Sequence, residues 1–294
     1  MNAWGGLVAL SNEGALGFGG DSTGDPRVPI QTERDSSWTL KVSLSNSTDQ
    51  VIEGVWKLRT LEPGWVNQPE RRESFYSTSA MSIKEGLSRS WIYGGLRADG
   101  SGLGFNEMWE MRVGLEDQGM EQVEWAKWEG EGGPKGQGLN DGTAVLVPSS
   151  NGGLPTIYMI GGVETSENTL VSFNEISTFT PGSSLGTGSW STFTTTTTST
   201  STNVPQGRKG HSALYLGSGK IWLGGGRSLD GSLVWSDSWI LDLGEKSWTR
   251  MSDLKEGVWG ASTVVLGETV LMSFGELSSL PLARQISSRA DLRD

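Results

Sequence analysis

The sequence predicts an all-β protein built from repeated four-stranded antiparallel sheets. The first observation is the stretch 205–251, where four short apolar or aromatic segments alternate with turns rich in Gly, Asp and Ser. The second is the return of the same marker residues along the chain. The third is composition, because 43 glycines accompany no long apolar segment of helical periodicity. Repeated units of this kind bury their apolar faces by packing on one another.

A glycine pair follows the second segment of each copy, where glycine lets the backbone bend and approach a neighbour closely. The pairs are Gly19–Gly20, Gly94–Gly95, Gly161–Gly162 and Gly224–Gly225, with the single Gly275 as a weaker fifth copy. Their spacing along the chain is irregular, which predicts loops of unequal length between copies.

Tryptophans recur in register with the glycine pairs. Trp109 follows Gly94 by 15 residues, and Trp239 follows Gly224 by 15. The fourth segment of successive copies is marked by Trp128, Trp190 and Trp248. Such large apolar side chains predict packing between adjacent sheets. The alternative is a tryptophan cage for a ligand, with Trp235 as its best member.

The start of the unit carries a third marker, Arg208 followed by His211. The same spacing from a proline recurs in Pro69, Arg72 and Phe75, and in Pro134, Gln137 and Asn140. Together the markers resemble the kelch repeat, whose pattern is Arg-x-x-His, a double glycine after strand two, an aromatic residue on strand three and Trp on strand four. The resemblance covers residues 5–276. It departs where Gln137 and Asn140 replace Arg and His, and where the fifth copy has one glycine.

The kelch resemblance implies a β-propeller of four four-stranded blades and the inner half of a fifth. The propeller occupies residues 1–277, with blades at about 5–60, 72–129, 140–194, 207–252 and 258–277, and an irregular tail at 278–294. The expected strands are 7–10, 15–18, 38–42 and 55–58; 77–82, 89–93, 106–113 and 125–128; 143–147, 156–160, 174–179 and 190–193; 213–216, 221–223, 237–242 and 248–251; and 262–266 and 270–274. Kelch rings usually close with six or seven blades, so the chain is expected to be an open arc, either a fragment of a longer parent or the product of an unsound gene model.

Composition argues against several function classes. A net charge of −11 and a pI near 4.7 disfavour nucleic acid or an anionic membrane surface as partner. The lack of cysteine excludes disulfides, thiolate metal sites and a cysteine nucleophile. The sequence has no apolar run of 18 residues and no signal peptide, which predicts a cytoplasmic chain, or a cell-surface or extracellular one if a parent carries a membrane anchor. Asn46 and the Thr/Ser run 194–202 are candidate sugar attachment sites.

Groups able to perform chemistry are few. His211 is the only histidine, and its place in the repeat favours packing over general-base catalysis. The loop 217–220 lacks parts of a phosphate-binding loop, and 228–231 misplaces the glycine of a sialidase Asp-box. Copper oxidases that share the propeller need histidine and cysteine groups that cannot be assembled here. No catalytic residue, cofactor or metal site is therefore predicted.

The loops that join strands two to three and four to one predict the functional face. Both kinds leave a four-stranded meander at the same end, and they are longer than most hairpins at the other end. The residues they would present are Arg27, Arg34, Arg97, Asp99, Glu164, Arg227, Asp230 and Trp235. An ordinary solvated role is the alternative for each of them.

Two function classes follow from this face. The first is a non-catalytic scaffold or interaction module whose arginines bind an acidic protein partner, with a glycan as the second ligand considered. The alternative is a propeller enzyme or metal-dependent cofactor protein, in which Asp99, Glu164 and Asp230 converge at the mouth of the channel. Convergence of the carboxylates distinguishes the two classes, because catalysis requires it and binding does not.

Overall fold

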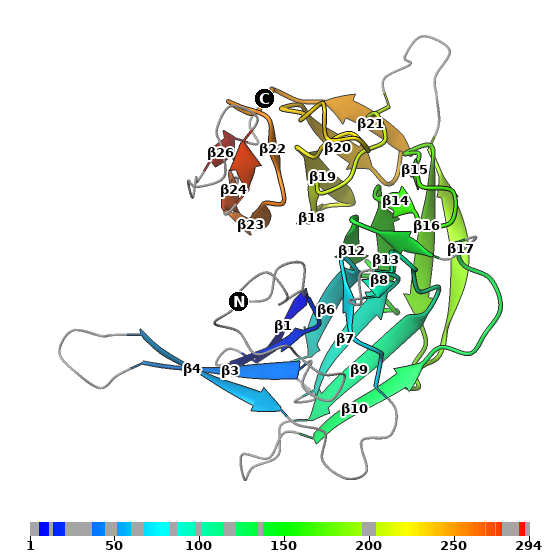
Figure 1. Ribbon diagram of the computed structural model, residues 1–294, viewed down its shortest axis with the longest axis vertical. Helices are drawn as coiled ribbons and strands as arrows, with labels where there is room; N and C mark the ends of the chain where they lie inside the picture. Colours follow the sequence, from blue (N-terminus) through cyan, green and yellow to red (C-terminus); the bar gives the residue numbers. More distant parts are fainter. Residues whose placement is uncertain are drawn as a thin grey trace. The chain divides into compact units, whose positions relative to one another are not determined.

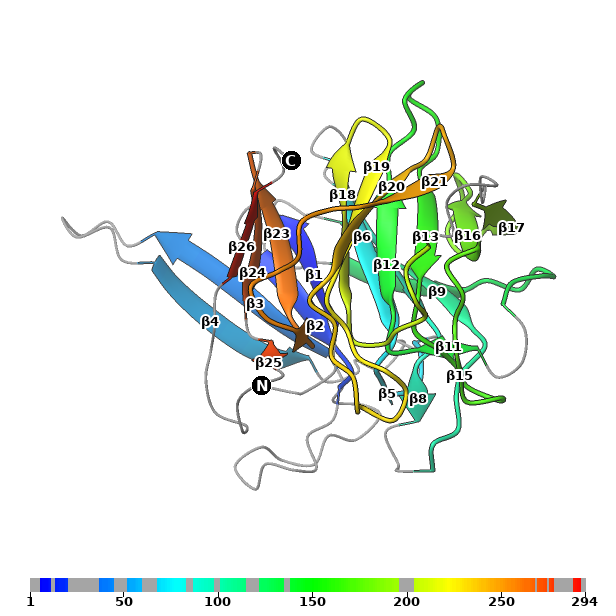
Figure 2. The same ribbon diagram turned by 90° about the horizontal axis from the view of Figure 1, so that it is seen from above.

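A computed structural model of the chain consists of strands and loops and has no helix among the residues it describes (Figures 1 and 2). These residues are 6–11, 14–20, 37–44, 52–59, 68–82, 87–97, 101–114, 122–134, 138–195, 204–267, 269–273, 275–277 and 288–291. The all-β prediction is confirmed. The chain divides into two compact units: unit 1 holds residues 1–131 and 182–188, and unit 2 holds residues 132–181 and 189–294.

Unit 1 contains two four-stranded antiparallel sheets whose strands follow chain order. The first comprises β1 (Gly6–Ser11), β2 (Gly14–Phe18), β3 (Ser37–Leu44) and β4 (Ile52–Arg59). The second comprises β6 (Tyr76–Ser82), β7 (Leu87–Tyr93), β9 (Met108–Gly114) and β10 (Gln122–Lys127). In the second sheet the inner strands β7 and β9 bury large apolar side chains, among them Trp91, Ile92, Met108 and Met111.

Unit 2 contains two sheets of the same plan and a smaller third one. The first comprises β12 (Thr143–Val147), β13 (Thr156–Ile160), β16 (Glu175–Pro181) and β17 (Gly188–Thr194), whose first residue belongs to unit 1. The second comprises β18 (Ser212–Gly217), β19 (Lys220–Gly224), β20 (Ser238–Asp242) and β21 (Ser247–Arg250), side by side in Figure 2. The third comprises β23 (Ser262–Leu266), β24 (Thr269–Ser273) and β26 (Ser288–Asp291).

Strand β26 departs from the irregular tail predicted for residues 278–294. It pairs antiparallel with β24, with Thr269 opposite Asp291 and Met272 opposite Ser288. The segment carries neither the glycine pair nor the tryptophan that mark the other strands, so the repeat pattern could not find it. The free edge of β24 offers backbone donors and acceptors to any nearby segment, and β26 takes them up.

Short strands organise the loops at one end of the sheets, and we call each group a loop sheet. They are β5 (Arg72–Glu73) with β8 (Leu96–Arg97); β11 (Leu139–Asn140) with β14 (Val163–Glu164) and β15 (Thr169–Leu170); and β22 (Val258–Trp259) with β25 (Glu276–Leu277). In the second sheet of unit 2 the equivalent pairing consists of single bridges from Lys209 to Arg227 and from Arg227 to Val234. Each loop sheet pairs the segment before strand one with the segment after strand two. The long loops predicted from the sequence are therefore partly ordered as strands.

The cores lie between successive sheets within each unit. In unit 1 the buried cluster comprises Phe18, Phe75, Ile92, Trp109, Met111 and Trp125. In unit 2 one cluster comprises Val145, Ile160, Phe173, Ile176, Ala213, Ile221, Leu223, Trp239, Leu241 and Trp248, and another comprises Trp222, Leu254, Val258, Val270 and Met272. Trp128 and Trp190 are half-buried; Trp128 donates its indole N–H to the Gly188 carbonyl at 3.0 Å, and Trp190 lies against Phe179 with ring centroids 5.1 Å apart.

The glycine pairs take left-handed backbone angles, and this corrects the sequence alignment at one copy. The pairs with positive φ at both residues are Gly19–Gly20, Gly94–Gly95, Gly161–Gly162 and Gly225–Gly226. Gly224 is instead the last residue of β19, where it pairs with Ser238. Three consecutive glycines left the register open in the sequence, and the ladder between β19 and β20 decides it. The fourth repeat pair is Gly225–Gly226 and not Gly224–Gly225.

A second correction concerns the start of the third copy. Thr143 pairs with Ile160 just as Ser212 pairs with Gly224, so Leu139 and Gly142 take the places of Arg208 and His211. The same register aligns the residues with left-handed φ just before strand one, which are Ser74, Asp141, Gly210 and Gly260. Asn140 therefore does not replace the histidine, and Gln137 lies outside the described residues. Proline spacing misled the alignment because the loop before this copy differs in length.

Successive sheets are joined by the same hydrogen bonds at each junction in unit 2. The N–H of Gly162 donates to the Arg208 carbonyl at 2.9 Å, and that of Gly226 donates to the Val258 carbonyl at 2.7 Å. In unit 1 the N–H of Gly20 donates to the Arg72 carbonyl at 2.9 Å. A Cβ on Gly19 would lie 2.5 Å from that same carbonyl oxygen, so the first glycine of a pair cannot be replaced without moving the neighbouring sheet. The glycines thus fix the spacing of the sheets.

Candidate partner-binding loops

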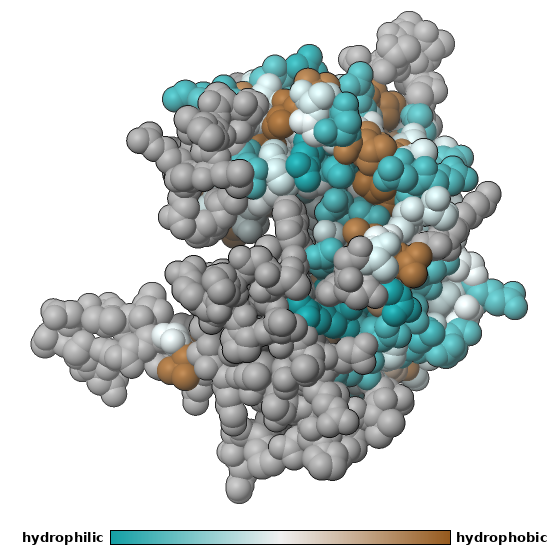
Figure 3. Space-filling model, in the orientation of Figure 1, coloured by the Kyte–Doolittle hydropathy of each residue, from teal (hydrophilic) through white to brown (hydrophobic). Residues whose placement is uncertain are grey.

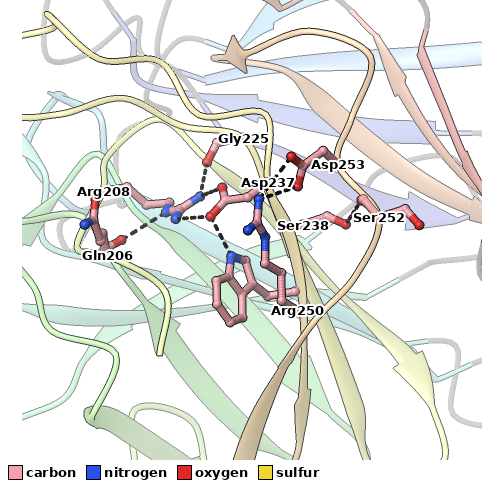
Figure 4. A network of polar contacts seen from close by, with 9 residues as sticks. Gln206, Arg208, Gly225, Asp237, Ser238, Arg250, Ser252 and Asp253 are labelled. Carbon is pink, nitrogen blue, oxygen red and sulfur yellow. Dashed lines mark hydrogen bonds and ion pairs between the residues drawn. The ribbon is translucent and has the colours of Figure 1, made fainter. Parts of the chain in front are cut away.

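A buried arginine supports the loop sheet in the middle of unit 2, and Figure 4 shows its contacts. Arg208 is fully buried and donates from Nε to the Gln206 carbonyl at 3.0 Å and from Nη1 to the Gly225 carbonyl at 2.9 Å. Its other bonds go to both carboxylate oxygens of Asp237, at 2.5 and 2.9 Å. We call this group an arginine node. It ties the segment before β18, the glycine pair and the start of β20 to one side chain.

The carboxylate of this node stays ionised despite its burial. Burial alone would raise the pKa of Asp237, but the hydrogen bond and charge of Arg208 and the indole N–H of Trp239, at 2.7 Å, outweigh it and hold the pKa below its ordinary value. The pair is therefore charged on both sides, and the charge-assisted bonds are the strong kind.

Unit 1 contains a second arginine node with the same connections. Arg72 is fully buried and donates from Nε to the Glu70 carbonyl at 3.1 Å and from Nη1 to the Gly94 carbonyl at 3.1 Å. Its carboxylate is Glu107, at 3.0 Å, which also accepts the indole N–H of Trp109 at 2.9 Å. Burial would raise the pKa of Glu107, but bonds from Trp109, Arg72 and Lys127 hold it below its ordinary value.

Neither carboxylate of these nodes is among the site residues predicted from the sequence. A signal for them was present, because each lies two residues before the tryptophan of strand three, as Glu107 before Trp109 and Asp237 before Trp239. A carboxylate at that spacing projects from the same side of the strand as the indole, because side chains alternate along a strand. Both accept the indole N–H of that tryptophan.

An aromatic residue covers each arginine node. Phe105 lies over Arg72, with 4.0 Å from the guanidinium carbon to the ring centroid, and Trp235 lies over Arg208 at 4.6 Å. The two residues are equivalent, since the Phe105 N–H donates to the Gly95 carbonyl at 3.0 Å and the Trp235 N–H to the Gly226 carbonyl at 2.9 Å. Trp235, predicted as a ligand anchor, has one ring face occupied by the node.

The predicted arginines differ in their surroundings. Arg97 also lies over Phe105, with its guanidinium carbon 4.8 Å from the ring centroid, and it forms an exposed ion pair with Glu70 at 2.8 Å. Arg227 lies over Trp259, with its guanidinium carbon 3.5 Å from the ring centroid. Arg27, Arg34 and Asp99 lie outside the described residues.

The two predicted carboxylates in the described residues each stabilise their own loop. Glu164 accepts bonds from the Ser166 hydroxyl at 2.6 Å and the Glu167 N–H at 2.6 Å; burial opposes the shift, but these bonds lower its pKa. Asp230 accepts the Ser228 hydroxyl at 2.6 Å and the Ser232 N–H and hydroxyl at 3.1 and 2.9 Å, which lowers its pKa to about 2. No bond joins Glu164 to Asp230 among the described residues. Their placement is that of loop caps.

His211 lies in the core between two sheets of unit 2. Its ring packs edge-on against Phe173, with centroids 6.0 Å apart, and a Cβ on Gly161 would meet its Cε1. Neither ring nitrogen makes a hydrogen bond to the described residues. Burial, followed by the charge of Arg208, lowers the pKa of His211 to about 3, against the opposing effect of the Ile160 and Arg208 carbonyls. The ring is neutral at physiological pH and fills a packing position.

Two loops carry an exposed leucine at the same structural position. The Arg97 N–H donates to the Leu103 carbonyl at 2.8 Å, and the Ser228 N–H donates to the Leu233 carbonyl at 2.9 Å. Leu103 is 49% exposed and Leu233 is 47% exposed. Each comes directly before a residue that bridges to the loop sheet, Gly104 or Val234, and two residues before the aromatic residue that covers the node. On the face shown in Figure 3 the apolar residues of the described part are scattered among hydrophilic ones. An exposed leucine that recurs at the same structural position is stronger evidence of a binding surface than exposed apolar residues scattered singly.

Three further observations bound the site. Among the described residues, no three His, Asp or Glu side chains gather closely enough to hold a metal ion. The same part of the chain has no helix with the length and apolar character needed to cross a membrane. No family model matches the chain, and a search of curated proteins finds no significant match to its sequence.

Proposed function

We propose that the chain is a non-catalytic interaction module of the kelch type, a β-propeller that binds a protein partner with the loops carried by its loop sheets. The propeller is supported by sheets whose four strands follow chain order and by the glycine hydrogen bonds that recur at successive junctions of unit 2. Radial repetition of such sheets is how propellers limit their exposed edges.

The observation that carries the binding proposal is a loop base built twice on the same plan. In each copy an arginine node holds the loop base, an aromatic residue covers the node, and a leucine about half exposed stands beside it. Folding these loops orders charged and aromatic side chains well beyond what a sheet connection needs. An apolar side chain whose backbone is already hydrogen-bonded, as at Leu103 and Leu233, loses less conformational entropy on binding, which favours affinity. The leucines are the anchors of the proposed contact.

The proposal is tested by placing a charge at the leucines. The variant Leu103→Asp/Leu233→Asp and the matched control Leu154→Asp are immobilised, and proteins captured from an extract of the expressing cells are quantified by mass spectrometry. Leu154 is 44% exposed in the loop between β12 and β13, at the opposite end of its sheet. We expect a partner that binds the unmodified chain and the control but is recovered at about one-tenth or less by the double variant. Equal recovery by both variants contradicts the proposal, and unchanged thermal unfolding shows that each variant is folded.

A further inference from the structure

The side chain of Arg227 lies over an indole ring and has no carboxylate partner among the described residues. Its guanidinium carbon is 3.5 Å from the centroid of Trp259, and its Nε is buried without a hydrogen bond. Within the described part of the chain, no hydrogen bond or ion pair of this side chain is found. A cation that is partly removed from water and left unneutralised is costly, so a counter-charge is expected at this position.

Arg227 is unusual among the arginines of the described residues. Those that form an ion pair with a carboxylate are Arg72, Arg89, Arg97, Arg112, Arg208 and Arg250. The fold does not require arginine at position 227, because the equivalent residue of other loop sheets is Leu96 or Val163. An arginine that neither the fold nor an internal carboxylate explains points to an external ligand.

The surroundings of Arg227 add positive charge and an apolar contact. Lys209 and Val234 are its bridge partners on either side, and paired residues project to the same face of a sheet. The Lys209 ammonium is 3.9 Å from the Asp141 carboxylate, at the limit of an ion pair. Leu233 adjoins Val234 and is 47% exposed. Glu276 pairs with Trp259 through its backbone and forms no ion pair with Arg227 in the described residues.

We propose that Arg227, packed on the ring of Trp259, is the receptor for an aspartate or glutamate side chain of the protein partner. A planar guanidinium binds a carboxylate through two parallel hydrogen bonds, and because Nε of Arg227 is buried these bonds come from its two terminal nitrogens. Packing on an indole holds the group in place before the ligand arrives. The inference rests on the proposed interaction function and assigns its chemistry: the partner presents an acidic side chain to the Arg227 guanidinium.

A peptide titration followed by NMR tests the receptor directly. The protein carries 15N-labelled arginine, and the Nε–H signal of Arg227 is assigned by its loss in Arg227→Lys. The probe is the acetylated, amidated peptide Leu-Glu-Glu-Leu, with Leu-Gln-Gln-Leu as the uncharged match. We expect the Arg227 signal to shift in a saturable way as the glutamate peptide is added. The glutamine peptide should bind at least tenfold more weakly, and the affinity for the glutamate peptide should fall as the salt concentration rises. The signal of Arg250, already paired with Asp253, serves as the internal control and should not move.

Three outcomes overturn the receptor: no shift of Arg227, equal shifts with both peptides, or an unchanged affinity in Arg227→Gln. Trp259→Leu provides a second variant, which keeps the arginine but removes its platform and should weaken the glutamate peptide several-fold. Capture of the partner separates this inference from the proposed function. If Arg227→Gln recovers as much partner as the unmodified chain while the double leucine variant loses it, the loops bind but Arg227 is not the receptor. If the double leucine variant also keeps the partner, the interaction module itself is contradicted.

Discussion

The arginine nodes allow a sharp test, because unit 1 presents a buried and an exposed arginine on the same aromatic ring. Arg72 and Arg97 are paired in the β5–β8 loop sheet, and both guanidinium groups lie over Phe105, at 4.0 and 4.8 Å. Arg72 is fully buried with Glu107, whereas Arg97 and Glu70 have side chains 40% and 49% exposed. The substitutions Arg72→Met and Arg97→Met each remove one charge and keep the apolar stem.

The expected costs differ because burial differs. Removing one partner of a buried pair costs about 3–5 kcal/mol, since the remaining charge is left without compensation. Glu107 is 26% exposed and keeps Lys127 at 3.0 Å, so Arg72→Met should fall near the lower limit, about 3 kcal/mol. The exposed pair of Arg97 contributes about 0–1 kcal/mol and its stacking about 0.5 kcal/mol, which places Arg97→Met near 1 kcal/mol.

Hydrogen exchange of the β9 amides in urea measures both variants on one reporter strand in the same unit. This local measurement is needed because a chain with two units need not unfold in a single step. The double variant Arg72→Met/Glu107→Met should recover at least about 1 kcal/mol, because it removes the uncompensated carboxylate. A difference of less than about 1 kcal/mol between Arg72→Met and Arg97→Met, or a double variant less stable than Arg72→Met, would refute the argument that burial makes the node costly to break.

Three more predictions concern His211, the glycine pairs and the secondary structure. The pKa of His211 is about 3 in the folded chain and 6.5 in its ordinary state, so the stabilisation from the buried neutral ring is complete above pH 6.5 and is lost as the pH falls. Between pH 6.5 and 5 the free energy of unfolding should drop by about 2 kcal/mol. Urea titrations of His211→Phe, which places the residue of the equivalent position Phe75 there, should show no such histidine-dependent loss. Gly225→Ala should lower the midpoint of thermal unfolding far more than Gly102→Ala. Both glycines have left-handed φ, but only a Cβ on Gly225 collides with the Val258 carbonyl, whereas Gly102 faces open space. Equal shifts would contradict the idea that Gly225 is needed for the close approach of the next sheet. Far-ultraviolet circular dichroism should report less than about a fifth helix, and a larger fraction would be incompatible with the all-β fold.

The strands and their order could be predicted from the sequence, because they depend on local patterns. Short aromatic and β-branched segments between glycine-rich turns form strands whatever surrounds them, and consecutive strands joined by short turns pair antiparallel. The predicted hairpin of Ala213–Leu216 and Ile221–Leu223 lies within the paired strands β18 and β19. Buried tryptophans such as Trp109, Trp239 and Trp248 were identified as packing residues from their recurrence alone.

The register at glycine and proline markers could not be read from the sequence, since several alignments satisfy the same spacing. Only the cross-strand ladders show that Gly225–Gly226 forms the fourth pair and that Leu139 takes the arginine position of the third copy. Strand β26 exists because the free edge of β24 accepts it, and no local pattern encodes that edge.

The sequence by itself determined which residues could contribute charge at the loop end, and only tertiary structure decided which of them are already neutralised. Arg97 and Arg227 are alike in sequence, in loops that follow a glycine pair. In the folded chain Arg97 meets Glu70 across 27 residues, whereas Arg227 meets the ring of Trp259 and no carboxylate of the described residues. Ion pairs and stacking depend on distances between segments far apart along the chain, and those distances are fixed only when the sheets pack.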